Sequence, residues 1–379
     1  MKIAYVTTYD SSDESAWSGS GKAILQTLQD GGFQTESIGD LKEPWAFFLK
    51  VKKVVYAKLL SKNYLRDREP IALKSFATQV NKCLDSMQYD LIFSPGTIPV
   101  SYLQVEKPLV FWTDATFAGM EDFYPEFSDL CSETIRDGNK MEQLALTNCR
   151  LAIYSSEWAA TSAIQNYDVD PAKVKVVPFG ANITCNRSLE DIQVIIKSKK
   201  SDICKLIFLG VDWVRKGGDK ALAVTDLLIK RGIKTELHVV GCNPPMNVPD
   251  YVKCHGFISK KTKVGRETFD KLMSESHFLI LPSVAECYGV AFAEASSYGL
   301  PSIATNVGGI PTAIKEGRNG QTFDLDDNVE KYGDYIENLL LSKQKYSELS
   351  LTSFEEYSER LNWSSASKKV KELILTHCN

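Results

Sequence analysis

Two carboxylates, Glu286 and Glu294, lie in a stretch of the sequence, residues 283–309, that otherwise has the composition of a protein interior. The pattern predicts a buried strand that ends at Pro282, a loop that contains the first Glu, and a helix that contains the second and ends at Gly299. The start of such a helix offers free backbone N–H groups and about half a positive charge, which favour phosphate.

The two carboxylates cannot ligate that phosphate because like charges repel, so we expect them to accept hydrogen bonds from hydroxyl groups on either side of it. Gly289 lets the backbone approach the anion. A molecule with hydroxyls at both ends of a diphosphate is a nucleotide sugar, whose ends are a ribose and a hexose. The alternative is that both Glu are solvated positions on a surface helix, but the apolar run from Val290 to Ala295 leaves little polar face.

The segment LGVDWVRKGGDKAL, residues 209–222, carries a second candidate site. A predicted strand ends at Gly210, and the loop after it offers Arg215 and Lys216 before a Gly-Gly pair. Cations and permissive backbone at the carboxyl end of a strand suit a leaving diphosphate. The alternative for both residues is a solvated loop charge.

Near the amino terminus, WSGSGKAILQTL contains Gly19 and Gly21. A phosphate-binding Walker loop needs a glycine where Ala16 stands and a hydroxyl residue where Ala23 stands, so that motif is excluded. A dinucleotide-binding fingerprint needs a glycine at Ile24 and is also excluded. Glycines that serve only a flexible turn remain an alternative.

The apolar run PLVFWTDATF ends in Thr113 and Asp114, which are polar. Their place at the end of a predicted strand makes them candidates for contact with a substrate. For Asp114, capping the next helix is the alternative to binding an acceptor.

Short β-branched and aromatic runs alternate with segments of helical period along the whole chain. Continuous apolar strands separated by helices indicate parallel sheets covered on both faces, which is an α/β fold. The predicted strands are KIAYVTT, DLIFS, PLVFWT, RLAIYS, VKVVPFG, KLIFLG, TELHVVG, HFLILP and PSIATN.

A polar segment, residues 180–200, interrupts this alternation of strands and helices. It predicts a linker and hinge between two doubly wound domains. The ligand should then lie where the two sheets face each other, at the carboxyl ends of their strands. We expect the first domain to span residues 1–190 and the second residues 191–360, with a final helix in residues 361–379.

The composition restricts the function classes further. The chain has 379 residues, 44% of them hydrophobic, and 44 basic against 48 acidic residues, so it lacks the positive charge of a general nucleic-acid binder. It opens in a strand-like run without the features of a secretory signal, and no apolar run approaches about 18 residues. Nine irregularly spaced cysteines fit reduced thiols, so we expect a cytoplasmic protein.

The spacing of the two Glu resembles that of a known family. Glu286-Cys-Tyr-Gly-Val-Ala-Phe-Ala-Glu294, then Tyr298-Gly-Leu-Pro301 and Gly308-Gly-Ile-Pro311, looks like the E-x7-E region of the retaining glycosyltransferases of family 4. The resemblance implies the GT-B fold, with two Rossmann-like domains and the active site in the cleft between them. It spans nearly the whole chain and is strongest from 205 to 320.

The resemblance also implies roles for the residues of this motif. Glu286 would bind the transferred sugar and Glu294 the ribose. The backbone of Gly289 and Val290 would bind the distal phosphate.

The loop after Gly210 that carries Arg215 and Lys216 is called the cation loop below. In it, Lys216 stands where the family has a diphosphate-binding lysine. The family usually has Gly-Arg at the strand end, whereas this chain has Gly210 followed by Val211. Whether Arg215 replaces the missing arginine stays open. The resemblance therefore implies a catalytic set of Lys216, Glu286 and Arg215.

Three further stretches match the family less closely. Gly21 and, with less support, Gly19 would face the phosphates and the reacting sugar of the donor. Thr113-Asp114 stands where the family often has His-Asp, so the His contact to the sugar is absent. Main-chain atoms near Phe257 and Ile258, in CHGFISK, would contact the nucleobase, and the final helices would cross back onto the first domain.

Residues 44–66 lie in the part of the chain, residues 40–90, where the resemblance is weakest. Large apolar residues cluster on one helical face there, with lysines nearby. Such a basic amphipathic helix can lie on an anionic membrane surface and deliver a lipid-linked acceptor. The alternative is a helix packed on its own domain.

Together these features predict a retaining hexosyltransferase that moves a sugar from a nucleotide-diphosphate sugar to a hydroxyl of a glycan, a lipid-linked or a small-molecule acceptor. We expect neither a cofactor nor a metal, because the cations of the loop can stabilise the leaving diphosphate. The alternatives are a nucleotide-sugar epimerase or hydrolase of the same fold, a phosphorylase-like enzyme, and a non-catalytic nucleotide-sugar or glycan binding protein.

Overall fold

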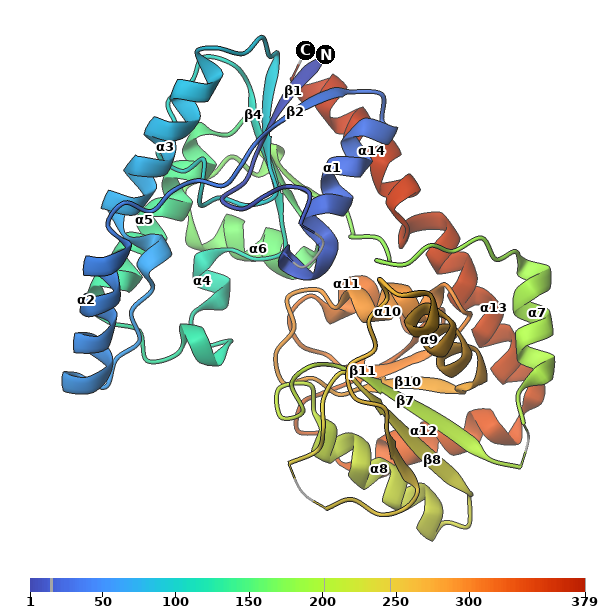
Figure 1. The fold of residues 1–379 in the computed structure, drawn as a ribbon. Coiled ribbons are helices and arrows are strands. Elements are labelled where there is room, and N and C mark those ends of the chain that lie inside the picture. Colours follow the sequence, from blue (N-terminus) through green and yellow to red (C-terminus); the bar gives the residue numbers. More distant parts are fainter. Residues whose placement is uncertain (14–15, 201, 246, 379) are drawn as a thin grey trace. The chain divides into compact units, whose positions relative to one another are not determined.

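The computed structural model describes residues 1–13, 16–200, 202–245 and 247–378 (Figure 1). The chain forms two compact units. The first unit is Met1–Pro178 with Trp363–Asn379, and the second is Phe179–Asn362. The boundary between them therefore falls at Pro178, earlier than the expected residue 190.

The first unit contains a six-stranded parallel sheet in the order β2-β1-β3-β4-β5-β6. Its strands are β1 (Lys2–Val6), β2 (Gln34–Ile38), β3 (Leu91–Ser94), β4 (Leu109–Thr113), β5 (Leu151–Tyr154) and β6 (Val174–Val176). Its α-helices are α1 (Ser20–Asp30), α2 (Ala46–Leu59), α3 (Pro70–Leu84), α4 (Phe117–Met120), α5 (Ser132–Asn148), α6 (Glu157–Asn166) and α14 (Trp363–His377). Its 3₁₀ turns are η1 (Ala16–Gly19), η2 (Arg66–Arg68), η3 (Pro125–Phe127) and η4 (Pro171–Lys173).

The second unit repeats this architecture with the strand order β12-β11-β10-β7-β8-β9, again all parallel. Its strands are β7 (Cys204–Leu209), β8 (Thr235–Val240), β9 (Val252–Cys254), β10 (Phe278–Leu281), β11 (Ser302–Thr305) and β12 (Gly320–Phe323). Its helices are α7 (Leu189–Ser198), α8 (Gly218–Lys230), α9 (Lys263–Glu275), α10 (Val290–Ser296), α11 (Ile310–Ala313), α12 (Val329–Leu341) and α13 (Lys343–Arg360).

The central strands lie in the interior of each unit because their residues are apolar on both faces. Every residue of β4, β5 and β10 is buried, as parallel strands between two helical layers require. The buried central strands fix the positions at which they end. The loops that follow those ends carry most of the candidate site residues.

The expected α/β fold with two parallel sheets is confirmed, and all nine expected strands are present. Three further strands, β2, β9 and β12, were not predicted. Each lies at an edge of its sheet, where one side of the strand lacks a neighbour and the sequence need not be continuously apolar.

The polar segment of residues 180–200 is not the linker that its composition suggests. It belongs to the second unit and contains α7, whose start is fixed by a capping box between Ser188 and Asp191. Ile192 is buried, and α7 packs against α13. Glu190, Asp191 and Lys197 lie on the exposed face of this amphipathic helix.

The last helix, α14, belongs to the first unit, as the family resemblance implies. The hydroxyl of Ser367 donates a hydrogen bond to the carbonyl of Thr27 at the end of α1, over 2.7 Å. The indole of Trp363 packs edge-to-face on Trp112 of β4, with ring centroids 5.8 Å apart. These contacts hold α14 against α1 (Figure 1).

Candidate active site

The cation loop follows β7 and is held by its own acidic residue. Asp212 accepts a hydrogen bond from the backbone N–H of Arg215, over 3.0 Å, and forms an ion pair with its guanidinium at 3.5 Å. The stem of Lys216 lies against Gly210, where an added Cβ would come within 2.8 Å of the lysine Cγ. The missing side chain at Gly210 therefore makes room for Lys216.

This loop is joined to the loop that carries Glu286. Gly217 adopts a left-handed conformation (φ 77°), and a Cβ there would come within 2.0 Å of the carbonyl oxygen of Pro282. The backbone N–H of Val284 donates to the carbonyl of Arg215 over 2.8 Å. Only glycine permits so close an approach, so Gly217 allows the two loops to come together.

Glu286 and the two cations form one cluster. The carboxylate of Glu286 is only 8% exposed and forms an ion pair with the ammonium of Lys216. The guanidinium of Arg215 lies 3.8 Å from the same carboxylate oxygen and donates to the carbonyl of Ala285 over 3.2 Å. Two cations thus share the carboxylate of Glu286, and both ends of this cluster come from loops that follow parallel strands.

Glu294 lies on α10 and is also buried. Its carboxylate pairs with the ammonium of Lys260, which comes from the segment between β9 and α9. Gly289 is the N-cap of α10 with φ 85°, and Val290 is its first residue. The predicted loop, helix start and helix end near Gly299 therefore agree with the structure.

The expected base-binding turn lies in the same segment as Lys260. Phe257 is 76% exposed and Ile258 is half-buried. An aromatic side chain this exposed is available to a flat ligand. Glu286, Glu294, Lys216 and this turn all belong to the second unit.

The two glycines near the amino terminus belong to the first unit. Gly19 is the N-cap of α1 in a left-handed conformation, and Gly21 already lies within that helix. A Cβ on Gly21 would come within 2.1 Å of the hydroxyl of Tyr9, and its carbonyl accepts a hydrogen bond from Tyr5 over 2.6 Å. Close packing against these two tyrosines is thus a sufficient reason for a glycine at position 21.

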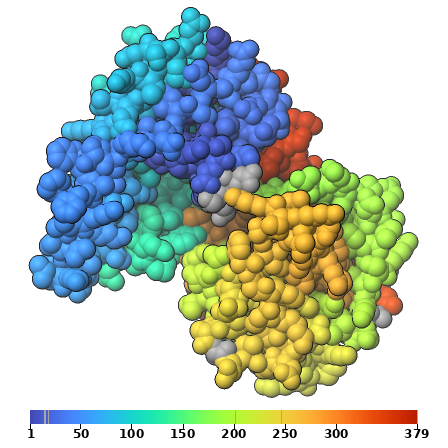
Figure 2. Space-filling model, in the orientation of Figure 1, coloured from blue at the N-terminus to red at the C-terminus, as the bar shows by residue number. Residues whose placement is uncertain are grey.

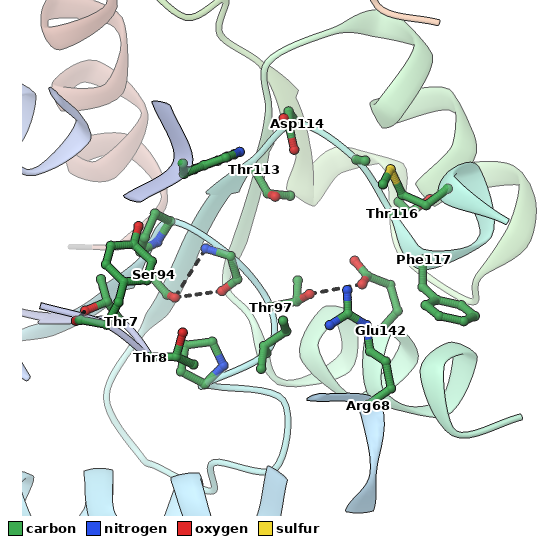
Figure 3. Close-up of a pocket in the computed structure, with 18 of the residues that line it drawn as sticks. Thr7, Thr8, Arg68, Ser94, Thr97, Thr113, Asp114, Thr116, Phe117 and Glu142 are labelled. Atoms are coloured by element: carbon green, nitrogen blue, oxygen red, sulfur yellow. Dashed lines mark hydrogen bonds between the residues drawn. The ribbon is translucent and has the colours of Figure 1, made fainter. Parts of the chain in front are cut away.

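Thr113 and Asp114 line a cavity of about 220 Å³ at the carboxyl ends of β1, β3 and β4 (Figure 3). The N-cap of α4 is Thr116, whose hydroxyl accepts the N–H of Gly119, so Asp114 is not the helix cap that was the alternative for it. The cavity wall carries several hydroxyl groups, namely those of Thr7, Thr8, Ser94, Thr97, Thr113 and Thr116.

A carboxyl group lies at the bottom of this cavity. Glu142 of α5 is 2% exposed, and burial raises its pKa to about 7, although the hydroxyl of Thr97 and the positive charge of Arg68 oppose the shift. Thr97 donates to one carboxyl oxygen over 3.0 Å. Within the described part of the chain, the other carboxyl oxygen has no hydrogen-bond partner of ordinary geometry. The Arg68 side chain points toward Glu142 (Figure 3).

Sequence reasoning missed four residues of these sites, namely Arg68, Thr97, Glu142 and Lys260. Each is an ordinary polar residue in a helix or loop, and no spacing relates it to its partners. For Lys260 a signal existed, since a buried carboxylate such as Glu294 requires a cation or several donors nearby.

Several acidic groups in the chain have the spacing or proximity of metal ligands. Glu69, Glu133 and Asp137 lie close together in the first unit, but the ammonium of Lys52 already pairs with both Glu. Asp-x-Asp triplets occur at 168–170 and 324–326. These triplets are in neither of the two loops that carry Lys216 and Glu286.

A different surface of the first unit is apolar and exposed. The inner face of α2 is fixed by buried Leu49, by Lys52 between its two Glu partners, and by Tyr56, which donates to Glu133 over 3.0 Å. The outer face leaves large side chains in solvent, with Phe47 72% and Leu59 76% exposed. The exposed apolar residues in and next to this helix are Trp45, Phe47, Phe48, Val51, Val54, Val55, Leu59 and Leu60 (Figure 2 shows this segment in blue).

Comparison with known proteins also finds similarity to glycosyl transferases. Residues 204–342 match the family model described as "Glycosyl transferases group 1". The chain is 22% identical over 335 residues to a D-inositol 3-phosphate glycosyltransferase of Corynebacterium diphtheriae, covering 81% of this chain and 76% of the relative. It is 23% identical to the Corynebacterium urealyticum protein of the same name, over 76% and 71% of the two chains.

Solved structures with the same fold cover almost the whole chain. Sucrose-phosphate synthase from Thermosynechococcus elongatus superposes with a TM-score of 0.71 at 16% identity, over 99% of this chain and 98% of that one. Anabaena HepE, solved in complex with UDP-glucose, gives a TM-score of 0.65 at 16% identity, over 99% and 100% of the chains. Residues 204–342 are thus similar to the group 1 glycosyl transferases, and the chain has the GT-B fold, as its E-x7-E motif predicts.

Proposed function

We propose that the protein transfers a hexose, with retention of anomeric configuration and without a metal ion, from a nucleotide-diphosphate sugar to a hydroxyl of an acceptor. The observation that carries this proposal is the cluster of Lys216, Arg215 and Glu286. It offers two cations to a diphosphate and a carboxylate to a sugar hydroxyl, on loops that Gly217 locks together.

The chemical barrier in such a transfer is charge separation. The anomeric carbon becomes cationic while the bond to the diphosphate oxygen breaks, and the electron pair leaves with the diphosphate. Lys216 and Arg215 stabilise that departing charge, and a preorganised donor of this kind typically contributes about 10²–10³ in rate. In this role Arg215 replaces the arginine that the family has at Val211.

Glu286 has two tasks in this proposal. Without ligand, its carboxylate holds the ammonium of Lys216 in place and keeps two cations from repelling each other. With donor bound, the diphosphate takes over the cations, and the carboxylate accepts a hydrogen bond from a hydroxyl of the transferred sugar.

Glu294 and Lys260 hold the other end of the donor. The carboxylate of Glu294 accepts the ribose hydroxyls, and its pairing with Lys260 fixes its orientation. The exposed ring of Phe257 and the main chain at Ile258 contact the base. Gly289 and Val290 place free backbone N–H groups beside the distal phosphate.

For the acceptor, the hydroxyl-lined cavity of the first unit offers a binding site. With a pKa of about 7, Glu142 can either accept or donate a hydrogen bond near neutral pH, which suits hydroxyl groups of either orientation. Arg68 beside it would pair with an anionic group. A polyol or sugar that carries a phosphate meets both requirements, and the relatives named D-inositol 3-phosphate glycosyltransferases make that class the first to test.

We further propose that the outer face of α2 docks on an anionic membrane surface. Its exposed apolar side chains can be buried at the boundary between the lipid headgroups and the acyl chains. Exposed Lys50, Lys53 and Lys58 would be attracted to the negative charge of the headgroups. None of the helices in the described part of the chain is long and apolar enough to span a membrane. Docking would therefore be peripheral.

A product assay tests the transfer directly. The protein is incubated with UDP-, GDP- and ADP-sugars, with EDTA, and with or without inositol phosphate and simple sugar phosphates. We expect one donor to release its nucleoside diphosphate in an acceptor-dependent way, and the product to keep the anomeric configuration of the donor by proton NMR.

The other outcomes separate the alternatives. Donor consumption that needs no acceptor would indicate a hydrolase or epimerase, and binding without turnover would indicate a binding protein. An inverted product would overturn the retaining proposal, and activity abolished by EDTA but restored by a divalent ion would overturn metal independence.

A further inference from the structure

A second cavity lies in the second unit, at the amino ends of β7, β8 and β10. Its volume is about 700 Å³, and its walls come from α7, the start of β7, the turn before β8, α12 and α13. Lys216 and Glu286 follow the carboxyl ends of β7 and β10. Because the strands are parallel, the cavity lies at the opposite edge of the sheet from the proposed donor site, and its function must be a different one.

The charge of this cavity differs from that of the protein. The chain as a whole has a net charge of −4, yet the cavity is lined by five lysines and a single carboxylate, that of Asp202. The lysines are Lys197, Lys199, Lys200, Lys234 and Lys343. Among the residues that the structure describes, none of these five is in an ion pair. Positive charge that no carboxylate neutralises favours an anionic ligand.

One of these lysines is held inside the cavity by hydrogen bonds. The ammonium of Lys199 donates to the hydroxyl of Tyr346 over 2.9 Å, and that hydroxyl donates in turn to the carbonyl of His277, also over 2.9 Å. His277 is itself fixed, because its ring accepts the backbone N–H of Lys205 over 3.1 Å. The chain of bonds orients Lys199 without neutralising it, and burial lowers its pKa to about 7.

A second part of the lining is apolar. It is made by Ile196, Ile203, Ile233, Leu339 and Leu340. Volumes of about 300–1,000 Å³ with a largely apolar wall and a few convergent polar groups are typical of small-molecule sites. A bare inorganic ion would leave this wall unused.

We propose that this cavity binds a small organic anion, a phosphate or carboxylate attached to an apolar or ring-shaped body. The anionic group pairs with Lys199 and with the lysines at the rim, Lys234 and Lys343, while the body packs on the isoleucines. Such a site is distinct from the donor and acceptor sites, and the proposal holds whether or not those are assigned correctly.

Calorimetric titration of the full chain with phenyl phosphate and with inorganic phosphate tests this site. Phenyl phosphate should bind more tightly, because its ring meets the apolar wall. Lys199→Gln, and separately the double variant Lys234→Gln with Lys343→Gln, should each weaken phenyl phosphate binding at least ~10-fold, which is about 1.4 kcal/mol. The double variant changes exposed residues only, so it guards against a Lys199→Gln protein that fails to fold.

Two control proteins make the result decisive. Lys230→Gln with Lys253→Gln removes two exposed lysines outside the cavity, and Lys216→Gln weakens phosphate binding at the proposed donor site. Both should bind phenyl phosphate within ~2-fold of the unmodified protein. The proposal is overturned if binding is lost in Lys216→Gln, if the cavity variants bind like the control, or if no binding is seen up to ~10 mM.

Discussion

Replacing Lys216 with alanine should lower kcat by about 10²–10³-fold, since it removes one of the two cations that we propose stabilise the departing diphosphate. The effect should fall mainly on turnover, because the negative charge on the diphosphate grows as the glycosidic bond breaks. Donor binding should weaken less, since Arg215 stays 3.8 Å from Glu286 and still offers one cation.

Two comparisons make this prediction specific. Lys216→Arg keeps the charge and should recover part of the rate. Lys230→Ala changes an exposed position at the end of α8, the helix that follows the loop of Lys216, and should leave the rate unchanged. Steady-state kinetics with saturating acceptor give kcat and KM for each variant. A folded Lys216→Ala protein with near-normal kcat would remove the basis for the phosphate assignment.

The second large effect is expected for α2. Replacing Phe47 and Leu59 by serine removes two highly exposed apolar side chains from its outer face. Full burial of such a side chain contributes about 1.5–3 kcal/mol, so partial insertion of both should contribute about 2–3 kcal/mol. Partitioning onto anionic vesicles should therefore weaken by roughly 30-fold or more.

Co-sedimentation with phosphatidylcholine vesicles, with and without phosphatidylglycerol, measures this partitioning. The matched control replaces Val264 and Leu341, which are similarly exposed in the second unit, by serine. Lys50→Gln with Lys53→Gln should remove the preference for anionic lipid and leave the weak binding to neutral vesicles. If the unmodified protein sediments with neither vesicle, or if both serine variants sediment equally, α2 has another role.

Much of the fold could be predicted from the sequence because buried parallel strands have a strong signal. β4 and β10 each contain an unbroken apolar run of four residues, which is typical of strands covered on both faces. The edge strand β2, with the sequence QTESI, lacks that signal, since its stability comes from pairing with β1 rather than from burial. The polar segment with α7 was predicted wrongly for a related reason, because a helix on the surface needs only one apolar stripe.

The candidate site could be predicted only as far as it lies in contiguous motifs. Glu286 and Glu294 were found because a short spacing along the chain places both beside one helix start. Lys260 and Glu142 could not be found this way, because their partners come from elements far away in the sequence. Only the order of the parallel strands brings Thr97, which follows β3, to Glu142 on α5.

The loop after β7 has Val211 where the family has an arginine, and Arg215 follows four positions later. Val211 is exposed and offers no charge, whereas Arg215 is fixed by Asp212 and points to the carboxylate that also holds Lys216. A guanidinium four positions later in the loop can therefore supply the charge that the motif lacks at Val211.

The central claim is that the loops of the second unit bind the donor, and hydrogen exchange measured by mass spectrometry tests it most directly. The full chain is compared with and without the nucleoside diphosphate that stabilises it most in a thermal-shift screen, where about 100 times Kd adds roughly 2.7 kcal/mol. We predict slower exchange in peptides from residues 210–218, 255–260 and 284–296. Protection that is absent from all three segments, or that appears only around residues 196–204 and 339–347, would contradict the account.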